Sequence, residues 1–290
     1  MLDLNLFKIK YSELYENKYN EILKNRTSKN ALKEALNGAQ CFSIKETFKW
    51  GIINFVPEYP VEVVWEIIHE TYLHYRLKEI NFETLTNADK MDIIKLSVSA
   101  EQSWKSSSGN TFETCIKEFM NPYLVENNIQ FILQKDLNEL IKKNNIHNCS
   151  EDINYLKERI KTCTFDLFAV VQVENRNYVF GCLQAKTSIR DRITRDREPS
   201  KTAMDNHFWS VIIALNGEFL KTPKYRAAVN GNSTEYTDNG WHAMYTMSDK
   251  YLGDRIKHID KTFLQIVEDA KIAADVFLNN RELLDLSFKI

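Results

Sequence analysis

An aspartate and a lysine lie on two neighbouring runs of strand-forming residues. Asp166 stands at the start of the run 165–173, and Lys186 ends the run 178–186. Both runs are rich in Val, Phe and Tyr, and the four polar residues 174–177 separate them, which predicts a β-hairpin. A hairpin of this kind would bring the acid at its beginning close to the base at its end.

The register of this hairpin follows from residue numbers, because residues that face each other across an antiparallel turn have numbers with a constant sum. A loop centred on Asn175 and Arg176 places Asp166 opposite Ala185 or Lys186. A carboxylate can hold a divalent cation, which lowers the pKa of a bound water and neutralises charge growing on a phosphate. A lysine beside it can position the attacking hydroxide. The pair therefore predicts metal-dependent hydrolysis of a phosphodiester.

A second carboxylate is expected to come from elsewhere in the chain. Gln184, which shares a strand face with Lys186, stands where a second acid would complete the site. Its carbonyl oxygen can bind a hard cation but adds no negative charge. Glu198 and Glu113 are the candidates. Each also has an ordinary interpretation, since Glu113 could favour a helix N-terminus and Glu198 could pair with a neighbouring arginine.

An Arg-Asp-Arg triplet follows the lysine directly. The side chains of Arg190 and Arg192 suit the O6 and N7 acceptors of guanine, and Asp191 can accept from the N4 amino group of cytosine. The triplet has the donors and the acceptor needed to read C:G pairs in a major groove, although such a charge run is often only an exposed ion-pair cluster. A second triplet occupies residues 195–197, and spacing alone does not separate the two copies.

The elements that must position these residues are read from hydrophobic periodicity. Apolar residues recur at helical spacing in six segments: 11–23, 44–55, 61–75, 92–104, 204–215 and 263–277. Residues 106–110 predict a turn that precedes another helix, with Glu113 in its first turn, and residues 224–229 predict a strand. The polar stretch 81–90 predicts a boundary between a helical N-terminal region, 1–90, and a second domain, 91–290.

Composition excludes several classes of protein. The chain has 290 residues, a formal net charge of −2 and five cysteines without a Cys-x-x-Cys pair, so neither a disulfide framework nor a zinc knuckle is predicted. No apolar run approaches the roughly 20 residues that cross a bilayer. A soluble, cytoplasmic protein is therefore expected. The near-zero charge argues against a protein that coats DNA nonspecifically but not against a locally basic cleft.

Several runs of sequence resemble the type II restriction endonucleases of the BsaWI family. These enzymes belong to the CCGG-recognising group of the PD-(D/E)XK nuclease superfamily. The runs that carry the resemblance are 99–105, 107–113, 133–138, 165–167, 179–200 and 239–245. The runs are spread over roughly the C-terminal two-thirds of the chain, which is the part that the resemblance covers. A glutamine at the position of Gln184 is a departure from the common nuclease motif that BsaWI-like sequences share.

The resemblance implies an α/β fold: a restriction-endonuclease-like PD-(D/E)XK core, with a central mixed sheet flanked by helices, and a helical N-terminal region. It implies Mg²⁺ as the cofactor. Asp166 and Glu198 would bind the metal, because the family places a displaced glutamate on the helix after the lysine. Lys186 would be catalytic, and Glu113 would support the metal or the lysine. The resemblance also favours the first triplet, Arg190-Asp191-Arg192, as the reader of CCGG.

The implied activity is metal-dependent double-strand cleavage of a palindromic DNA site that contains CCGG, with W/CCGGW as the BsaWI-type site. A homodimer or a higher homo-oligomer is expected, because a palindrome presents the same half-site twice. A cognate DNA methyltransferase would be the cellular partner. Two alternatives remain open: a sequence-specific DNA-binding protein that has lost cleavage, with Gln184 as the lesion, and a structure-specific PD-(D/E)XK repair nuclease.

Overall fold

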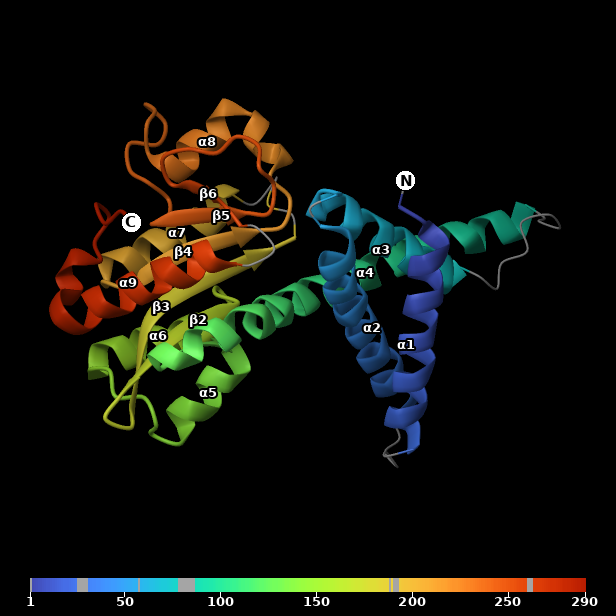
Figure 1. The fold of residues 1–290 in the computed structure, drawn as a ribbon, viewed down its shortest axis with the longest axis horizontal. Coiled ribbons are helices and arrows are strands. Elements are labelled where there is room, and N and C mark those ends of the chain that lie inside the picture. The colour runs from blue at the N-terminus through green and yellow to red at the C-terminus, as the bar shows by residue number, and fades with distance from the viewer. Residues whose placement is uncertain are drawn as a thin grey trace. The chain divides into compact units, whose positions relative to one another are not determined.

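The chain folds into two compact units in the computed structural model (Figure 1), Met1–Phe112 and Glu113–Ile290. The structure describes residues 2–24, 31–56, 58–77, 87–187, 189, 193–259 and 263–290. Each unit is described by itself. The functional division expected between residues 90 and 91 stays a prediction.

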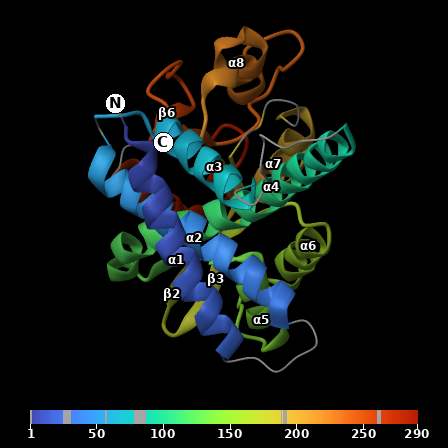
Figure 2. The same ribbon diagram turned by 90° about the vertical axis from the view of Figure 1, so that its right-hand side faces the viewer.

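The first unit is helical. Its described residues form three complete helices and the beginning of a fourth: α1 (Leu4–Lys24), α2 (Ala31–Phe55), α3 (Val61–Leu77) and α4 (Asn87–Leu124). The predicted helical segments in the first 77 residues are therefore confirmed. Helices α1 and α2 run side by side (Figure 2). Aromatic side chains fill the space between the helices, with ring centroids of Phe7 and Trp50 5.0 Å apart and those of Phe48 and Trp65 4.7 Å apart.

Helix α4 continues through residues 106–110, so the turn predicted there is wrong. Two of the residues that suggested a turn, Ser107 and Ser108, are buried. The hydroxyl of Thr111 donates a hydrogen bond to the carbonyl of Cys41, at 3.3 Å. Packing against α2 thus overrides the preference of these residues for turns. As a result, Glu113 lies in the interior of a long helix and not in a first helical turn.

The second unit is built on a six-stranded mixed sheet, whose strand order is the chain order β1-β2-β3-β4-β5-β6. The strands are β1 (Ile129–Leu133), β2 (Leu167–Val173), β3 (Arg176–Lys186), β4 (Trp209–Ala214), β5 (Ala243–Thr246) and β6 (Ile256–His258). The first three strands pair antiparallel, and β3 to β6 pair parallel. The predicted mixed sheet is confirmed.

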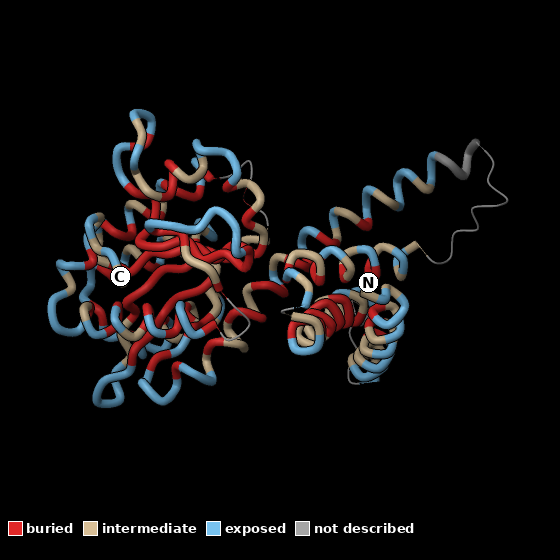
Figure 3. The backbone as a smooth tube through the Cα atoms, turned by 45° about the horizontal axis from the view of Figure 1, so that its top comes forward, coloured by how far each residue is buried: buried red, intermediate tan, exposed pale blue. Residues whose placement is uncertain are grey.

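Helices flank this sheet on both sides. They are α5 (Gln134–Lys142), α6 (Ser150–Lys161), α7 (Ile193–Asp205), α8 (Pro223–Asn230) and α9 (Leu264–Asn280). Apolar side chains of α5 and α6 cluster with Phe168 and Cys182, and those of α7 and α8 cluster with Ile212 and Met244. Helix α9 covers the other face, where the ring of Phe277 lies 6.4 Å from that of Phe180. The sheet is consequently the buried centre of the unit, as the red strands in Figure 3 show.

The helix predicted over residues 204–215 is wrong. Helix α7 ends at Asp205, and strand β4 follows. Every residue of β4 is buried, because this strand lies inside the sheet with parallel neighbours on both sides and both of its faces covered. Such a strand is apolar throughout and lacks the alternation that would identify it.

The strand predicted over residues 224–229 is also wrong, because these residues form the short helix α8. Pro223 occupies the first helical turn, where its missing N–H costs nothing. Gly231 ends the helix in the left-handed conformation, with φ 70°. A Cβ atom at that glycine would come within 2.2 Å of the backbone nitrogen of Asn239, so no larger residue fits. The apolar run between these two signals is thus part of a helix.

None of the helices within the described residues has the length and apolarity needed to cross a membrane.

Candidate active site

The β2–β3 hairpin predicted from the sequence is confirmed, with a tighter turn than expected. Glu174 and Asn175 form the two-residue connection, with φ values of 50° and 62°. Two successive positive φ values match the right-handed twist of the flanking strands. A register shift between Ala169 and Val170, within β2, then pairs Leu167 with Leu183. The loop centre is therefore one residue earlier than predicted, but the beginning of β2 still lies beside the end of β3.

Asp166 and Lys186 are in direct contact. The lysine Nζ donates a hydrogen bond to the aspartate Oδ2 over 2.6 Å, and the backbone N–H of Ala185 donates to the same oxygen over 2.7 Å. The backbone N–H of Asp166 donates to the carbonyl of Leu183, which fixes the aspartate at the end of the strand. The two side chains are only 14% and 21% exposed, for the aspartate and the lysine respectively. The structure thus brings together the acid and the base that the sequence placed on consecutive strands.

Glu113 is the third member of this cluster. The pKa of its carboxyl group is raised from 4.5 to about 8, mainly by burial and in addition by the negative charge of Asp166 and a hydrogen bond to that carboxylate. The positive charge of Lys186 acts in the opposite direction. The two carboxyl groups form a pair in a partly buried site, where a cation can replace the proton that the raised pKa of Glu113 keeps on that residue. Their oxygen atoms are the hard ligands that Mg²⁺ prefers.

Glu198 has its ion-pair partner outside this cluster. Its side chain, on α7, is 68% exposed, and its Oε1 is 3.2 Å from a guanidinium nitrogen of Arg197. Among the described residues, no group of three or more His, Cys, Asp and Glu side chains is arranged to hold a metal ion. The structure therefore joins Asp166, Lys186 and Glu113, and it gives Glu198 a partner on its own helix.

Gln184 is held by two hydrogen bonds that the sequence did not reveal. Its Oε1 accepts from the indole Nε1 of Trp241 over 2.8 Å, and its Nε2 donates to the backbone carbonyl of Asp196 over 3.0 Å. The side chain is 1% exposed. The oxygen considered as a cation ligand therefore has an indole N–H as its partner. Trp241, an aromatic residue in the run 239–245, was the only signal for this contact in the sequence.

The first Arg-Asp-Arg triplet, Arg190, Asp191 and Arg192, lies outside the described residues. Its neighbours in the chain are described: Ile189 and Ile193 are both buried in the cluster beneath α7 and α8.

Two of the three residues of the second triplet, 195–197, are buried within the protein. The guanidinium of Arg197 donates hydrogen bonds to the backbone carbonyls of Ala228 and Asp238 and lies 5.2 Å from the ring of Tyr236. The central aspartate is buried, and only Arg195 is exposed. A planar guanidinium with these partners cannot also make a bidentate contact with a base.

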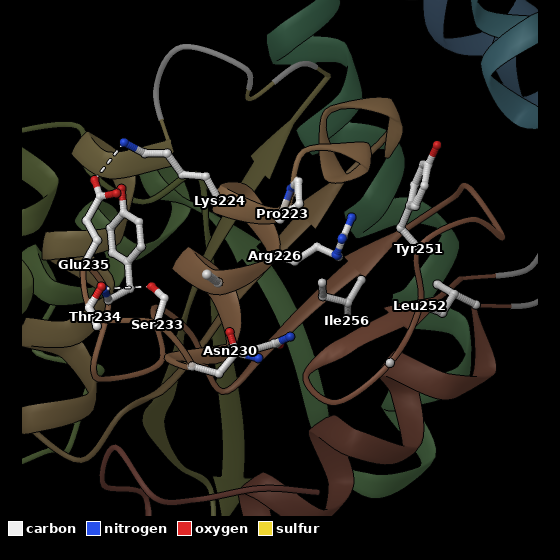
Figure 4. Close-up of a pocket in the computed structure, with 14 residues that line it drawn as sticks. Pro223, Lys224, Arg226, Asn230, Ser233, Thr234, Glu235, Tyr251, Leu252 and Ile256 are labelled. Atoms are coloured by element: carbon white, nitrogen blue, oxygen red, sulfur yellow. Dashed lines mark hydrogen bonds and ion pairs between the residues drawn. The ribbon is translucent and has the colours of Figure 1, made fainter.

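A cavity of about 590 Å³ lies elsewhere in the same unit (Figure 4). It is bounded by α8 and by the loops that contain Glu235 and Tyr251. Lys224 and Glu235 form an ion pair of 2.7 Å at one side, and Arg226 lies opposite, 5.9 Å from the ring of Tyr251. The lining holds a single carboxylate, which is already paired. This cavity therefore lacks the carboxylate pair found around Asp166.

Comparisons with known proteins identify the family of the chain. A family model described as BsaWI restriction endonuclease type 2 matches residues 139–276. The restriction endonuclease BsaWI, in a pre-specific complex with DNA, is 37% identical to the chain, with 98% of each chain covered and a TM-score of 0.68. The similarity thus extends beyond the C-terminal two-thirds on which the sequence resemblance depended.

The restriction endonuclease AgeI, in a specific complex with DNA, is 15% identical over 91% of each chain, with a TM-score of 0.53. This second likeness shows a shared fold. No curated protein sequence matches the chain. The identity to BsaWI over nearly the whole chain, together with the family model, establishes the relationship. The chain belongs to the BsaWI family of type II restriction endonucleases and is a site-specific deoxyribonuclease.

Proposed function

We propose that this endonuclease cleaves both strands of double-stranded DNA at a palindromic site containing CCGG, in a reaction that requires Mg²⁺. The observation that carries the proposal is the cluster of Asp166, Glu113 and Lys186, with the lysine Nζ 2.6 Å from the aspartate Oδ2. Two carboxyl groups and an ammonium group at the end of a hairpin are the parts that phosphodiester hydrolysis requires.

Asp166 would hold the cation, together with Glu113 or Glu198 as a second carboxylate. The raised pKa of Glu113 supports the first choice, because this carboxyl already shares the space around Asp166. A bound divalent cation supplies Lewis acidity, which activates water and offsets negative charge on the phosphate. The contact with the aspartate holds the amino group of Lys186 at the same place. Its ammonium group is thereby oriented to stabilise a phosphate oxygen that gains charge during cleavage.

Arg190, Asp191 and Arg192 would read the C:G pairs. This proposed role depends on the chemistry of the three side chains and on the resemblance to the family. The burial of Arg197 supports the choice of the first triplet over the second. A site of the form W/CCGGW is proposed from the resemblance. The symmetry of a palindrome favours a homodimer or a higher homo-oligomer, with a cognate methyltransferase protecting the same site in the cytoplasm.

Digestion of a mapped plasmid with and without Mg²⁺, followed by sequencing of the ends, tests this function. We expect discrete, metal-dependent fragments whose ends lie at CCGG sites. Lys186→Ala should reduce the cleavage rate by about 10³-fold, as removal of a transition-state donor commonly does, while DNA binding persists. Lys142→Ala is the matched control, because that lysine pairs with Glu139 on the exposed surface of α5.

A separate variant tests recognition. Arg190→Ala should lower cleavage at CCGG sites and weaken discrimination against sites with a changed C:G pair. An intact plasmid with specific retention of CCGG-containing DNA would contradict cleavage and favour the binding-only alternative. Nicks at junctions or flaps, without sequence preference, would favour a structure-specific nuclease.

A further inference from the structure

We infer that Gln184 is a positioning residue, which sets the place of the recognition segment, residues 187–192, relative to the catalytic lysine. The inference rests on the proposed function of that segment and of Lys186. It assigns to Gln184 a role in discrimination between DNA sequences, in place of the metal binding that its position in the nuclease motif suggests.

The carboxamide of Gln184 connects three parts of the second unit. The residue itself belongs to β3, two positions before Lys186. Its Nε2 donates to the carbonyl of Asp196 in the first turns of α7, and its Oε1 accepts from the indole of Trp241 in the segment that leads into β5. The Trp241 side chain is fully buried, in the same cluster as Ile193. A single side chain thus joins the catalytic strand, the following helix and the core.

These connections hold together the two elements that flank the recognition segment in the chain. The segment follows Lys186, the last residue of β3, and precedes Ile193, the first residue of α7. Its two ends are therefore attached to the two elements that the hydrogen bond from Gln184 to Asp196 holds together. A shift of α7 along β3 would move the arginines of the segment relative to the lysine. Displacements of about 1 Å are enough to reduce catalysis by about 10²-fold.

Pro199 weakens the same part of the helix. It lies inside α7 and has no N–H, so the carbonyl of Arg195, next to Asp196, lacks its helical hydrogen-bond donor. The Gln184 amide supplies a donor to that turn. On the other side of the proline, the helix is held differently, through a hydrogen bond of 2.7 Å between the buried hydroxyls of Ser200 and Ser210.

An amide is the side chain that this place requires. It must accept from an indole N–H at one end and donate to a carbonyl at the other, and a carboxamide does both at this length without having to bind a proton. An ionised glutamate would place a negative oxygen against the Asp196 carbonyl in a site that is 1% exposed. Both polar ends of Gln184 are used within the protein, so neither is directed at the carboxylates around Asp166.

The test compares Gln184→Met and Trp241→Phe with wild type on short duplexes that contain CCGG or a single substituted C:G pair. Methionine keeps the length but makes neither hydrogen bond, and phenylalanine keeps a buried ring but leaves the Gln184 oxygen without its donor. We expect kcat/KM for the CCGG duplex to fall about tenfold and the ratio of CCGG to substituted-site cleavage to fall about tenfold, as loss of one buried hydrogen bond allows. The Mg²⁺ concentration for half-maximal cleavage should stay within about twofold.

Ser200→Ala is the matched control, because it removes a buried hydrogen bond of the same helix beyond Pro199. It should lower the thermal midpoint by a similar amount and leave the cleavage ratio unchanged. Unchanged ratios in both Gln184→Met and Trp241→Phe, with only a lowered midpoint, would overturn the inference, as would tighter Mg²⁺ binding and faster cleavage by Gln184→Glu. If Gln184→Met does not fold, Trp241→Phe alone decides.

The wild-type protein separates this inference from the proposed function. Wild-type cleavage at CCGG duplexes is measured first, and its absence would refute the proposed function whatever the variants do. Wild-type cleavage together with unaltered discrimination in the variants would refute only the role of Gln184.

Discussion

His242 makes the stability of the second unit depend on pH in a way that can be worked out from its surroundings. Its Nδ1 accepts a hydrogen bond from the backbone N–H of Ser210 over 3.0 Å, and its Nε2 lies 2.8 Å from the backbone carbonyl of Asp285. This arrangement fits the neutral ring with its proton on Nε2. The pKa of His242 is lowered from 6.5 to about 4, mainly by burial and in addition by the nearby charge of Arg255.

The sign of the effect follows from proton linkage. The unfolded chain takes up a proton at this histidine below about pH 6.5, whereas the folded protein does so only below about pH 4. The contribution of His242 to stability is therefore complete above pH 6.5 and is lost as the pH falls from 6.5 toward 4. A difference of about 2.5 pKa units corresponds to about 3 kcal/mol in total, of which about 2 kcal/mol is lost between pH 7.5 and pH 5.

Denaturant unfolding of wild type and His242→Gln at pH 7.5 and pH 5 measures this contribution. The variant should be less stable at pH 7.5, and the difference between the two proteins should shrink by about 2 kcal/mol at pH 5. Other titrating groups, including Glu113, are present in both proteins and cancel in this difference. A difference that stays constant between the two pH values would refute the assignment of a neutral, buried imidazole.

Three further predictions concern single side chains. Arg281→Ala should lower the free energy of unfolding by about 3 kcal/mol in denaturant titrations, because it leaves the buried carboxylate of Asp152 without its bidentate partner; a loss below about 1 kcal/mol would contradict this. Glu113→Gln should raise the Mg²⁺ concentration for half-maximal plasmid cleavage by about tenfold, since second carboxylates at metal sites contribute on this scale; an unchanged Mg²⁺ titration would place the second carboxylate elsewhere. Gly51→Ala should lower the thermal midpoint of the first unit although alanine favours helices, because the added Cβ would lie 2.5 Å from Cγ1 of Val64; a raised midpoint would show that the helices separate at little cost.

The sequence was sufficient to predict the hairpin and the proximity of Asp166 and Lys186. Alternating apolar residues and a short polar loop are local signals, and they placed Asp166 beside the end of β3. The exact register was not predictable, because it depends on which loop residues adopt positive φ and on a register shift within the strand. The proximity of Glu113 depends on tertiary packing of a helix whose residue 113 precedes the hairpin by about fifty residues, and the sequence offered this glutamate only as one of two candidate carboxylates.

The two misassigned segments, β4 and α8, have different physical causes. In β4, burial on both faces replaces alternation with a continuous apolar run, and the end of α7 supplies apolar residues at helical spacing just before it. In α8, the run is too short for periodicity to decide, and the proline and glycine at its ends were the better signals. The role of Gln184 was hidden because its partner Trp241 is distant in sequence.

The identity of strand order and chain order has a consequence for how the unit assembles during synthesis. Each of the strands β2 to β6 pairs with the strand that precedes it, so only β1 must wait for a later strand before it finds its first neighbour. Low sequence separation between contacting residues shortens the search for the native pairing. The hairpin that joins Asp166 to Lys186 is complete as soon as β3 has emerged, whereas Trp241 is made more than fifty residues later. The nascent chain should thus contain the contact between Asp166 and Lys186 before it contains the core contact between Gln184 and Trp241.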